Sequence, residues 1–393
     1  MKNLLVLSTA YPRYKGDFYA IFVKELIENL KNVKVTILAP DDSLVRNDEN
    51  NVKRFHYFYP LNLQKLAYAL LPNLRKNPLL IFQLPLFLIF FLISTINLIK
   101  KSKFDFINSQ WLIPSGLIGA LCKKLFKIKH ILTTHGSDLE TLNKLPFRKQ
   151  IANFIFKNSD NIFFVSSYSK NLFKNLIKHE YKKQLDKKSF ILPMGVYTNK
   201  LRSKNNLSKI KKIYDIKTDK NIIYIGRLEG KKGLTYLIDS MPEVLKKFNV
   251  TVFILGEGPG KEEFMNRVKK LNLNNNIKFL GSTFGQKKLD FFKIADIFVN
   301  PSLDEGLPVT ILEAISNGKA IIATDVGGVS DIIRNNGNGI LIKPRNKNEI
   351  SNAIIELFSN PKFMKKLSIN ALKTSKRYDW EIISKKYNFI FNK

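Results

Sequence analysis

Glu305 and Glu313 stand eight positions apart in the stretch PSLDEGLPVTILEA, residues 301–314. Pro308 suits the first turn of a helix, where a missing N–H costs little, so we expect Glu305 beside a helix N-terminus and Glu313 about two turns inside that helix. Helix N-termini offer unpaired N–H groups to anions. Such N–H groups could hold the phosphates of a sugar nucleotide while both carboxylates bind its hydroxyls. The alternative is a surface loop followed by an amphipathic helix with a solvated glutamate.

A glycine-rich turn with two cations precedes this stretch. The sequence GRLEGKKG, residues 226–233, follows an apolar run and opens a helical pattern. Glycines let the backbone approach a diphosphate, and Arg227 and Lys232 can neutralise its charge. The Walker pattern GxxxxGK[ST] is absent, so this is not a P-loop. The turn is interpreted as a diphosphate site, although any strand-to-helix turn can contain glycine and lysine.

Two further motifs lie in the first half of the chain. His135 follows an apolar strand in TTHGSD, residues 133–138, where a histidine can serve the site or merely cap the strand. Gly16 lies in the loop after the first predicted strand. Because open parallel sheets bind ligands at the carboxyl ends of their strands, both motifs are candidates for a site.

The apolar runs that must position these residues alternate with helical patterns in two series, which predicts an α/β protein with parallel sheets. The first series has strands at 4–7, 33–38, 104–108, 131–134, 162–165 and 190–192, and the second at 222–225, 251–255, 277–280, 297–299, 320–323 and 339–342. We expect an N-terminal domain over 1–200, a polar, lysine-rich linker over 201–219 and a C-terminal domain over 220–376. A C-terminal helix over 377–393 is expected to pack back on the first domain.

Residues 79–99, LLIFQLPLFLIFFLISTINLI, have about the length and apolarity of a membrane-spanning helix. Gln83 and Pro85 interrupt the segment, and a span would separate strands of one sheet across a bilayer. We expect a buried or half-buried helix pair at a membrane interface. A plain core helix and a true span remain alternatives.

The charge and the cysteine and histidine content of the chain limit the kinds of partner and metal site that it can have. The formal net charge is +33, which predicts an anionic partner, although a general lysine bias would also produce it. One cysteine and four scattered histidines argue against a disulfide framework and a zinc cluster, and they fit a reducing compartment. The apolar run at 4–7 is too short for a signal peptide and is interpreted as a buried strand.

Together, the paired glutamates, GRLEGKKG, THGSD, PMGV at 193–196 and the glycine in the first loop resemble the retaining glycosyltransferases of family 4, the group 1 glycosyltransferases. The resemblance covers nearly the whole chain and is strongest from Asn221 to Ile342. It implies the GT-B fold, in which two Rossmann-like domains face each other across a cleft.

The resemblance also implies roles for individual residues. The first glutamate, Glu305, would contact the donor sugar near the reacting carbon, and Glu313 would bind the ribose hydroxyls. The implied catalytic residues are His135, Arg227, Lys232 and Glu305. The implied donor-binding residues are Gly16, Arg227, Lys232, Gly256, Gly258, Glu305, Gly306, Leu307, Pro308 and Glu313. The implied acceptor-side residues are Asp17, Phe18, Ser137 and Asp138.

The expected reaction is transfer of a sugar from a nucleoside-diphosphate sugar to a lipid-linked or glycan acceptor, with retention and without a metal or other cofactor. We expect a cytoplasmic protein held peripherally at the inner face of the membrane, with an anionic membrane surface and no nucleic acid as partner. Another reaction on the same fold, such as nucleotide-sugar epimerisation, is an alternative. A non-enzymatic basic protein that binds membrane or nucleic acid is another.

Overall fold

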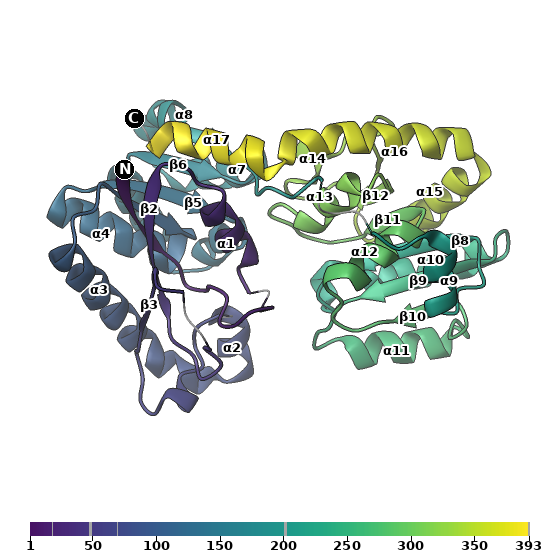
Figure 1. Ribbon diagram of the computed structural model, residues 1–393, viewed down its shortest axis with the longest axis horizontal. Coiled ribbons are helices and arrows are strands. Elements are labelled where there is room, and N and C mark those ends of the chain that lie inside the picture. The colour runs from purple at the N-terminus through teal and green to yellow at the C-terminus, as the bar shows by residue number, and fades with distance from the viewer. Residues whose placement is uncertain (18, 47–48, 69, 200–202, 392–393) are drawn as a thin grey trace. The chain divides into compact units, whose positions relative to one another are not determined.

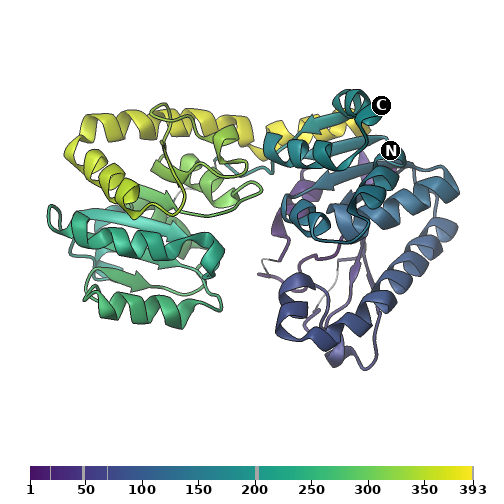
Figure 2. The ribbon, with the colours of Figure 1, turned by 180° about the vertical axis from the view of Figure 1, so that it is seen from behind.

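The computed structural model describes residues 1–17, 19–46, 49–68, 70–199 and 203–391, which form two compact units (Figure 1). The first unit contains Met1–Met194 and Trp380–Lys393, and the second contains Gly195–Asp379. In each unit a parallel sheet has helices on both faces, as the front and back views show (Figures 1 and 2). The predicted α/β class is therefore confirmed.

The sheet of the first unit has the order β3-β2-β1-β4-β5-β6-β7, and its paired strands are parallel. Its strands are β1 (Lys2–Leu7), β2 (Val33–Pro40), β3 (Val52–Phe55), β4 (Phe106–Gln110), β5 (Lys129–Thr134), β6 (Asn161–Phe164) and β7 (Ser189–Ile191). The central strands β1, β4 and β5 are almost entirely buried because helices cover both of their faces. β3 was not predicted, since its four residues carry Lys53 and Arg54 between two buried ends.

The helices of the first unit are α1 (Ile21–Glu28), α2 (Leu70–Lys76), α3 (Gln83–Lys101), α4 (Leu117–Phe126), α5 (Ser137–Asn143), α6 (Arg148–Lys157), α7 (Ser167–Leu176), α8 (Lys182–Lys188) and α17 (Trp380–Phe391). The C-terminal helix α17 crosses back into this unit from the second. Its Trp380 Nε1 donates to Glu25 Oε2 of α1 at 3.1 Å, and its Tyr387 ring meets Phe163 of β6 edge-on at 4.7 Å.

The sheet of the second unit has the order β10-β9-β8-β11-β12-β13. Its strands are β8 (Lys220–Ile225), β9 (Val250–Leu255), β10 (Ile277–Phe279), β11 (Ile297–Asn300), β12 (Ala320–Thr324) and β13 (Ile340–Ile342). Its helices are α9 (Leu207–Ile213), α10 (Leu234–Leu245), α11 (Lys261–Lys270), α12 (Gly285–Ile294), α13 (Val309–Ser316), α14 (Val329–Ile332), α15 (Lys347–Ser359) and α16 (Pro361–Ser375).

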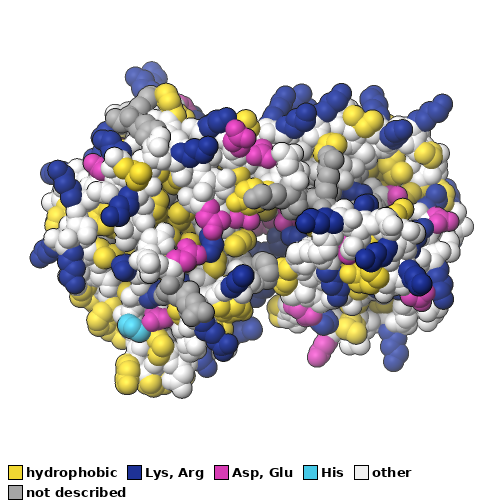
Figure 3. All heavy atoms as spheres, viewed as in Figure 1, with side chains coloured by type: hydrophobic (Ala, Val, Ile, Leu, Met, Phe, Trp, Pro, Cys, Tyr) yellow, Lys and Arg dark blue, Asp and Glu magenta, His cyan; other side chains and the backbone are white. Residues whose placement is uncertain are grey.

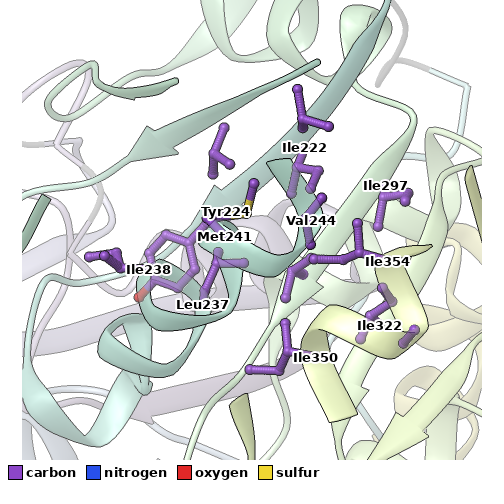
Figure 4. Packing of buried hydrophobic residues seen from close by; sticks show 14 of the residues in the cluster. Ile222, Tyr224, Leu237, Ile238, Met241, Val244, Ile297, Ile322, Ile350 and Ile354 are labelled. Atoms are coloured by element: carbon purple, nitrogen blue, oxygen red, sulfur yellow. The ribbon is translucent and has the colours of Figure 1, made fainter. Parts of the chain in front are cut away.

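Alternate residues of these strands enter two separate cores. Ile222, Tyr224 and Ile297 pack with α10 and α15 on one face, where Figure 4 shows them beside Leu237, Ile350 and their neighbours. Ile223 and Phe298 face the other way, toward the cluster that includes residues of α12 and α13. Because both faces of the sheet are packed, the strands are held in place. The loops at the carboxyl ends of these strands are therefore held in place too.

The predicted linker over 201–219 is partly wrong. Residues 207–213 form helix α9, capped by Asn206, whose side chain accepts a hydrogen bond from the backbone N–H of Lys209 at 2.8 Å. Ile210 is fully buried in the second unit, in the same core cluster as Phe291 of α12. The helix was missed because four of its seven residues are lysine or serine, and a single buried isoleucine leaves little periodicity.

Candidate active site

The strand order of the second sheet reverses between β8 and β11, and parallel sheets bind ligands at the carboxyl ends of the strands that flank such a reversal. The loop after β8 contains Arg227 and Lys232, and the loop after β11 contains Glu305. The structure therefore brings together residues that lie more than seventy positions apart in the sequence.

Lys232 and Glu305 form an ion pair at this point. Lys232 Nζ lies 2.7 Å from Glu305 Oε1, and Ser302 Oγ donates to the same oxygen at 2.7 Å. Both charged side chains are largely shielded from water. Among the described residues, nothing donates a hydrogen bond to the second oxygen, Glu305 Oε2, which leaves it available to a ligand hydroxyl. The contribution of Ser302 was not predicted, because serine is common in loops.

Helix α13 begins directly after this loop without a side-chain cap. Its N-cap residue is Pro308, and Ile311 N donates back to Pro308 O at 3.0 Å. Within the described part of the chain, the backbone N–H groups of Gly306, Leu307, Val309 and Thr310 have no acceptor. Unpaired N–H groups at the positive end of a helix dipole form an anion site. The prediction of such a terminus at Pro308 is confirmed in its geometry.

Two glycines bring the loops of this site into close contact. Gly233 has φ +65°, and a Cβ there would lie 1.9 Å from Pro301 O. Gly327 has φ +57°, and a Cβ there would lie 1.6 Å from Glu305 O. Any larger residue would push the β11 loop away from its neighbours, so both glycines position Glu305. The role of Gly327 was not predicted.

Gly256 and Gly258, predicted as donor-binding residues, have a packing reason to be glycine. A Cβ on Gly256, which has φ +149°, would lie 1.9 Å from Gly226 O, and one on Gly258 would lie 2.4 Å from Leu228 O. The loop after β9 thereby rests on the loop that carries Arg227. A contact with a nucleotide stays a prediction.

Glu313 lies nearer the helix start than predicted. It is the fifth residue of α13, little more than one turn inside, because Pro308 is the N-cap residue and the helix itself begins at Val309. Its Oε1 is 2.6 Å from Nζ of Lys288 on α12, a partner that no sequence spacing indicated. Arg227 is exposed, and its nearest carboxylate is that of Glu229 at 3.7 Å. Its guanidinium is therefore only loosely held and can turn toward an anion.

The first sheet also reverses its order, between β1 and β4, and the predicted residues of the first unit gather near that point. Gly16 is exposed with φ +97° in the loop after β1, where a Cβ would meet nothing within 4 Å. Its conformation, and not crowding, therefore favours glycine. Phe18 lies outside the described residues.

Asp17 is buried and bound by its own loop. Its Oδ2 lies 2.6 Å from Nε of Arg13 and accepts the backbone N–H of Arg13 at 3.1 Å. Burial alone would raise the pKa of Asp17, but the hydrogen bonds from Arg13 and from the Tyr19 N–H outweigh it and hold that pKa below its ordinary value. Asp17 thereby positions Arg13, and its place on the acceptor side stays a prediction.

His135 is oriented by a chain of hydrogen bonds through the sheet. Asn108 Nδ2 donates to Ile131 O at 3.2 Å, so Asn108 Oδ1 accepts from Gln110 Nε2. Gln110 Oε1 must then accept from His135 Nε2, at 2.9 Å. Burial lowers the pKa of His135 to about 3, so the ring is neutral at pH 7 and presents Nδ1 as an acceptor. Gln110 was not predicted.

Asp138 is buried and holds the backbone of the loop that contains His135. Its Oδ2 accepts from Leu112 N at 2.6 Å and its Oδ1 from His135 N at 3.1 Å. Burial raises the pKa of Asp138, although these N–H donors act in the opposite direction. The carboxylate is thus occupied by backbone N–H groups, and the predicted place of Asp138 on the acceptor side stays a prediction. Ser137, one residue earlier, is exposed.

Trp111 is strained beside His135. It has φ +71°, which is costly for a tryptophan, and its ring lies 4.8 Å from the His135 ring. Phe22 of α1 packs on the same imidazole at 4.8 Å. Both aromatic rings pack against the histidine and against each other, with their own centroids 5.8 Å apart, and this burial lowers the pKa of His135. Neither ring was predicted, because they come from elements far apart in the chain.

Comparison with known proteins identifies the family. Residues 207–374 match the model of glycosyl transferases group 1, and residues 20–183 match that of Glycosyltransferase Family 4. The uncharacterized glycosyltransferase MJ1069 of Methanocaldococcus jannaschii is 30% identical over 95% of this chain and 93% of its own. The UDP-Gal:alpha-D-GlcNAc-diphosphoundecaprenol alpha-1,3-galactosyltransferase of Escherichia coli is 26% identical over 68% of this chain and 69% of its own.

A solved structure matches the fold over its full length. HepE of Anabaena, in complex with UDP, is 17% identical, with a TM-score of 0.76 over 100% of both chains. The same protein has been solved with UDP-glucose, with a TM-score of 0.74. This chain is therefore a glycosyltransferase of the group 1, family 4 type with the GT-B fold.

Proposed function

We propose that this glycosyltransferase transfers a sugar from a nucleoside-diphosphate sugar to a lipid-linked or glycan acceptor with retention of anomeric configuration. The observation that carries the proposal is the Lys232–Glu305 ion pair beside the uncapped N-terminus of α13. A pair of opposite charges and a row of free N–H groups suit a ligand with both a diphosphate and a sugar.

The donor is held by groups that are already in place. The free N–H groups at the start of α13 and the ammonium of Lys232 bind the diphosphate, and exposed Arg227 closes on it. Lys232 has three N–H donors, so it binds phosphate without releasing Glu305. Glu313 binds the ribose hydroxyls. The UDP and UDP-glucose complexes of HepE support a donor of this class.

The proposed catalytic roles follow from the groups on which charge develops in the transition state, which are the leaving diphosphate and the donor sugar. As the bond between the anomeric carbon and the diphosphate oxygen breaks, its electron pair passes to the diphosphate, which Lys232 and the α13 N-terminus stabilise. Positive charge grows on the sugar, near Glu305. The acceptor hydroxyl attacks from the face that the diphosphate leaves, and its proton passes to a phosphate oxygen. Configuration is then retained without a second carboxylate placed about 5 Å away as a nucleophile.

The acceptor class is supported by one relative. The Escherichia coli galactosyltransferase is named for a diphosphoundecaprenol-linked substrate, and it aligns with 68% of this chain. In the first unit, Arg13 and the neutral His135 are the described groups held in place at the reversal of the sheet. We assign His135 to a sugar hydroxyl, which can donate a hydrogen bond to its Nδ1.

Transfer is tested with UDP-, GDP- and ADP-sugars and a membrane lipid extract as the acceptor pool. We expect release of nucleoside diphosphate that depends on the extract, and a glycolipid whose anomeric configuration, measured by NMR, equals that of the donor. An inverted product would contradict the retaining mechanism. Consumption of the donor to an epimer, without any extract, would favour the epimerase alternative.

Activity is expected to persist in excess EDTA. Arg227, Lys232 and the helix N-terminus provide the positive charge that a divalent cation supplies elsewhere, so the leaving diphosphate is neutralised by the protein itself. The measurement compares initial rates with EDTA, with EDTA and added Mg²⁺, and without either. Loss of activity that Mg²⁺ restores would show that the cations of the protein do not suffice.

A further inference from the structure

The helical segment Pro78–Lys101 of the first unit has two very different sides. It is long and apolar enough, by length and composition, to cross a membrane, yet only 28% of its most apolar stretch is buried. It consists of the short turn η2 (Pro78–Phe82) and helix α3, which continue into each other as one element. The sequence had predicted a pair of helices. Pro85 does not break the helix because it lies in the first turn of α3, where no N–H is required.

One narrow side of α3 attaches it to the sheet. Phe91 stacks on Phe55 of β3 at 4.7 Å, and Phe87 meets Tyr57 edge-on at 4.9 Å. Gln83 Nε2 donates to Leu63 O at 2.9 Å, and Thr95 is fully buried. These contacts make the helix part of the folded unit, so it is not free to leave the sheet and span a bilayer.

The opposite side exposes large apolar side chains. We call it the α3 face; it comprises Leu79, Ile81, Phe82, Ile89, Phe90 and Ile93, of which Leu79 and Phe82 are 72% and 75% exposed. Figure 3 shows hydrophobic side chains at the lower left of the molecule, in the region where Figure 1 draws the chain between the end of β3 and α3. Several large apolar side chains exposed on one element are typical of an interaction site.

The charge around the face is of one sign. Residues 50–104 contain eight lysines and arginines and no aspartate or glutamate. Lys65 and Lys76 are exposed just before the helical segment, and Lys100, Lys101 and Lys103 are exposed where it ends. A second copy of the chain would bring the same lysines face to face and be repelled. An apolar surface with cations at both ends instead complements anionic headgroups above acyl chains.

We propose that the α3 face docks this enzyme on an anionic lipid bilayer. Phe82, Ile89 and Ile93 lie at the level where headgroups meet acyl chains, and the lysines at both ends contact lipid phosphates. The inner leaflet of the cytoplasmic membrane carries such anionic lipid, so the enzyme works there as a peripheral protein. The proposal is independent of the donor site, because vesicle binding requires neither donor nor acceptor.

The apolar part is tested by flotation of the full chain with vesicles of phosphatidylcholine and phosphatidylglycerol. The variant Phe82→Ser/Ile89→Ser/Ile93→Ser is expected to lower the partition coefficient at least about tenfold, since each side chain removes several buried methylene equivalents. The control, Ile213→Ser/Met265→Ser/Ile369→Ser, changes similarly exposed side chains of the second unit and should bind as the unchanged protein does. Thermal melts by circular dichroism check that all variants fold.

The charged part is tested with Lys100→Gln/Lys101→Gln/Lys103→Gln in the same assay. Three lysines near an anionic surface account for roughly a hundredfold in partition coefficient. The control, Lys269→Gln/Lys270→Gln/Lys366→Gln, removes three exposed lysines of the second unit and should lose far less. Binding should be partly reversed by high salt and should be weaker on vesicles of phosphatidylcholine alone.

Three results would overturn the proposal. The first is that the unchanged protein does not float with the anionic vesicles. The second is resistance of the membrane-bound protein to alkaline carbonate, which would mean that α3 spans the bilayer. The third is a dimer in light scattering that Phe82→Ser dissociates, which would mean that a second copy covers the face.

Discussion

The Glu305→Gln variant is expected to turn over at least about a hundredfold more slowly than the unchanged enzyme, the loss typical when one preorganised charged or polar group is removed from a transition state. Glutamine keeps the shape of the side chain and can still accept a hydrogen bond from Ser302, but it removes the negative charge that balances Lys232 and that we assign to the donor sugar. Donor affinity should change much less, because the diphosphate contacts remain. Steady-state kinetics with the preferred donor gives kcat, and calorimetry gives affinity.

The neighbouring residue supplies the matched control. Asp304→Asn removes the same charge from the same loop, one position earlier, and should leave most of the activity. Equal losses in both variants would mean that the loop needs negative charge only in general. Turnover near that of the unchanged enzyme in Glu305→Gln would sink its assignment to the reacting centre.

The second large effect is expected for Lys232→Ala. This variant removes a cation aimed at the leaving diphosphate, so kcat should fall by about 10²–10³. Affinity for the free nucleoside diphosphate should fall by roughly ten- to a hundredfold, as when a charge-assisted hydrogen bond is removed. Because the alanine also leaves Glu305 without its cation, the double variant Lys232→Ala/Glu305→Gln should lose less than the sum of both single effects.

A second lysine–glutamate pair allows a comparison on the same domain. Lys288→Ala breaks the contact with Glu313, which has a similar length, 2.6 Å, and similar burial. Since Glu313 is assigned to the ribose, this variant should raise KM for the donor and leave kcat nearly unchanged. If Lys288→Ala lowers kcat as much as Lys232→Ala does, then the loss reflects broken ion pairs in general and not the diphosphate.

Most strands of the two sheets could be predicted because they contain short runs of apolar residues. β8 and β9 contain the apolar runs 222–225 and 252–255 because both faces of the sheet are covered, and such runs can be recognised in the sequence. Val52–Phe55 and Leu207–Ile213 escaped because each buries only a few residues and carries several charges. Burial of a single side chain depends on the tertiary fold, which a local pattern does not contain.

Site residues could be predicted where a reactive residue type also stands at a characteristic spacing from glycine, proline or another charged residue. Glu305 was found as the first of two glutamates eight positions apart, Pro308 because proline suits the first turn of a helix, and Lys232 because it lies in a glycine-rich turn with a second cation. Ser302, Lys288 and Gln110 are ordinary residues until the fold places them next to a glutamate or a histidine. Asp17 and Asp138 look like ligand-binding carboxylates in the sequence, and only the structure reveals that backbone N–H groups already occupy them.

Isothermal titration of the full chain with UDP, GDP and ADP measures whether the loops after β8 and β11 bind the nucleoside-diphosphate part of a donor. We expect one of the three to bind with one site per chain in the presence of EDTA, and to bind Lys232→Ala at least about tenfold more weakly. The same ligand should bind the α3-face variants as it binds the unchanged protein. If none of the three binds, or if binding of the nucleotide is insensitive to Lys232→Ala, the donor site does not lie at the loops after β8 and β11.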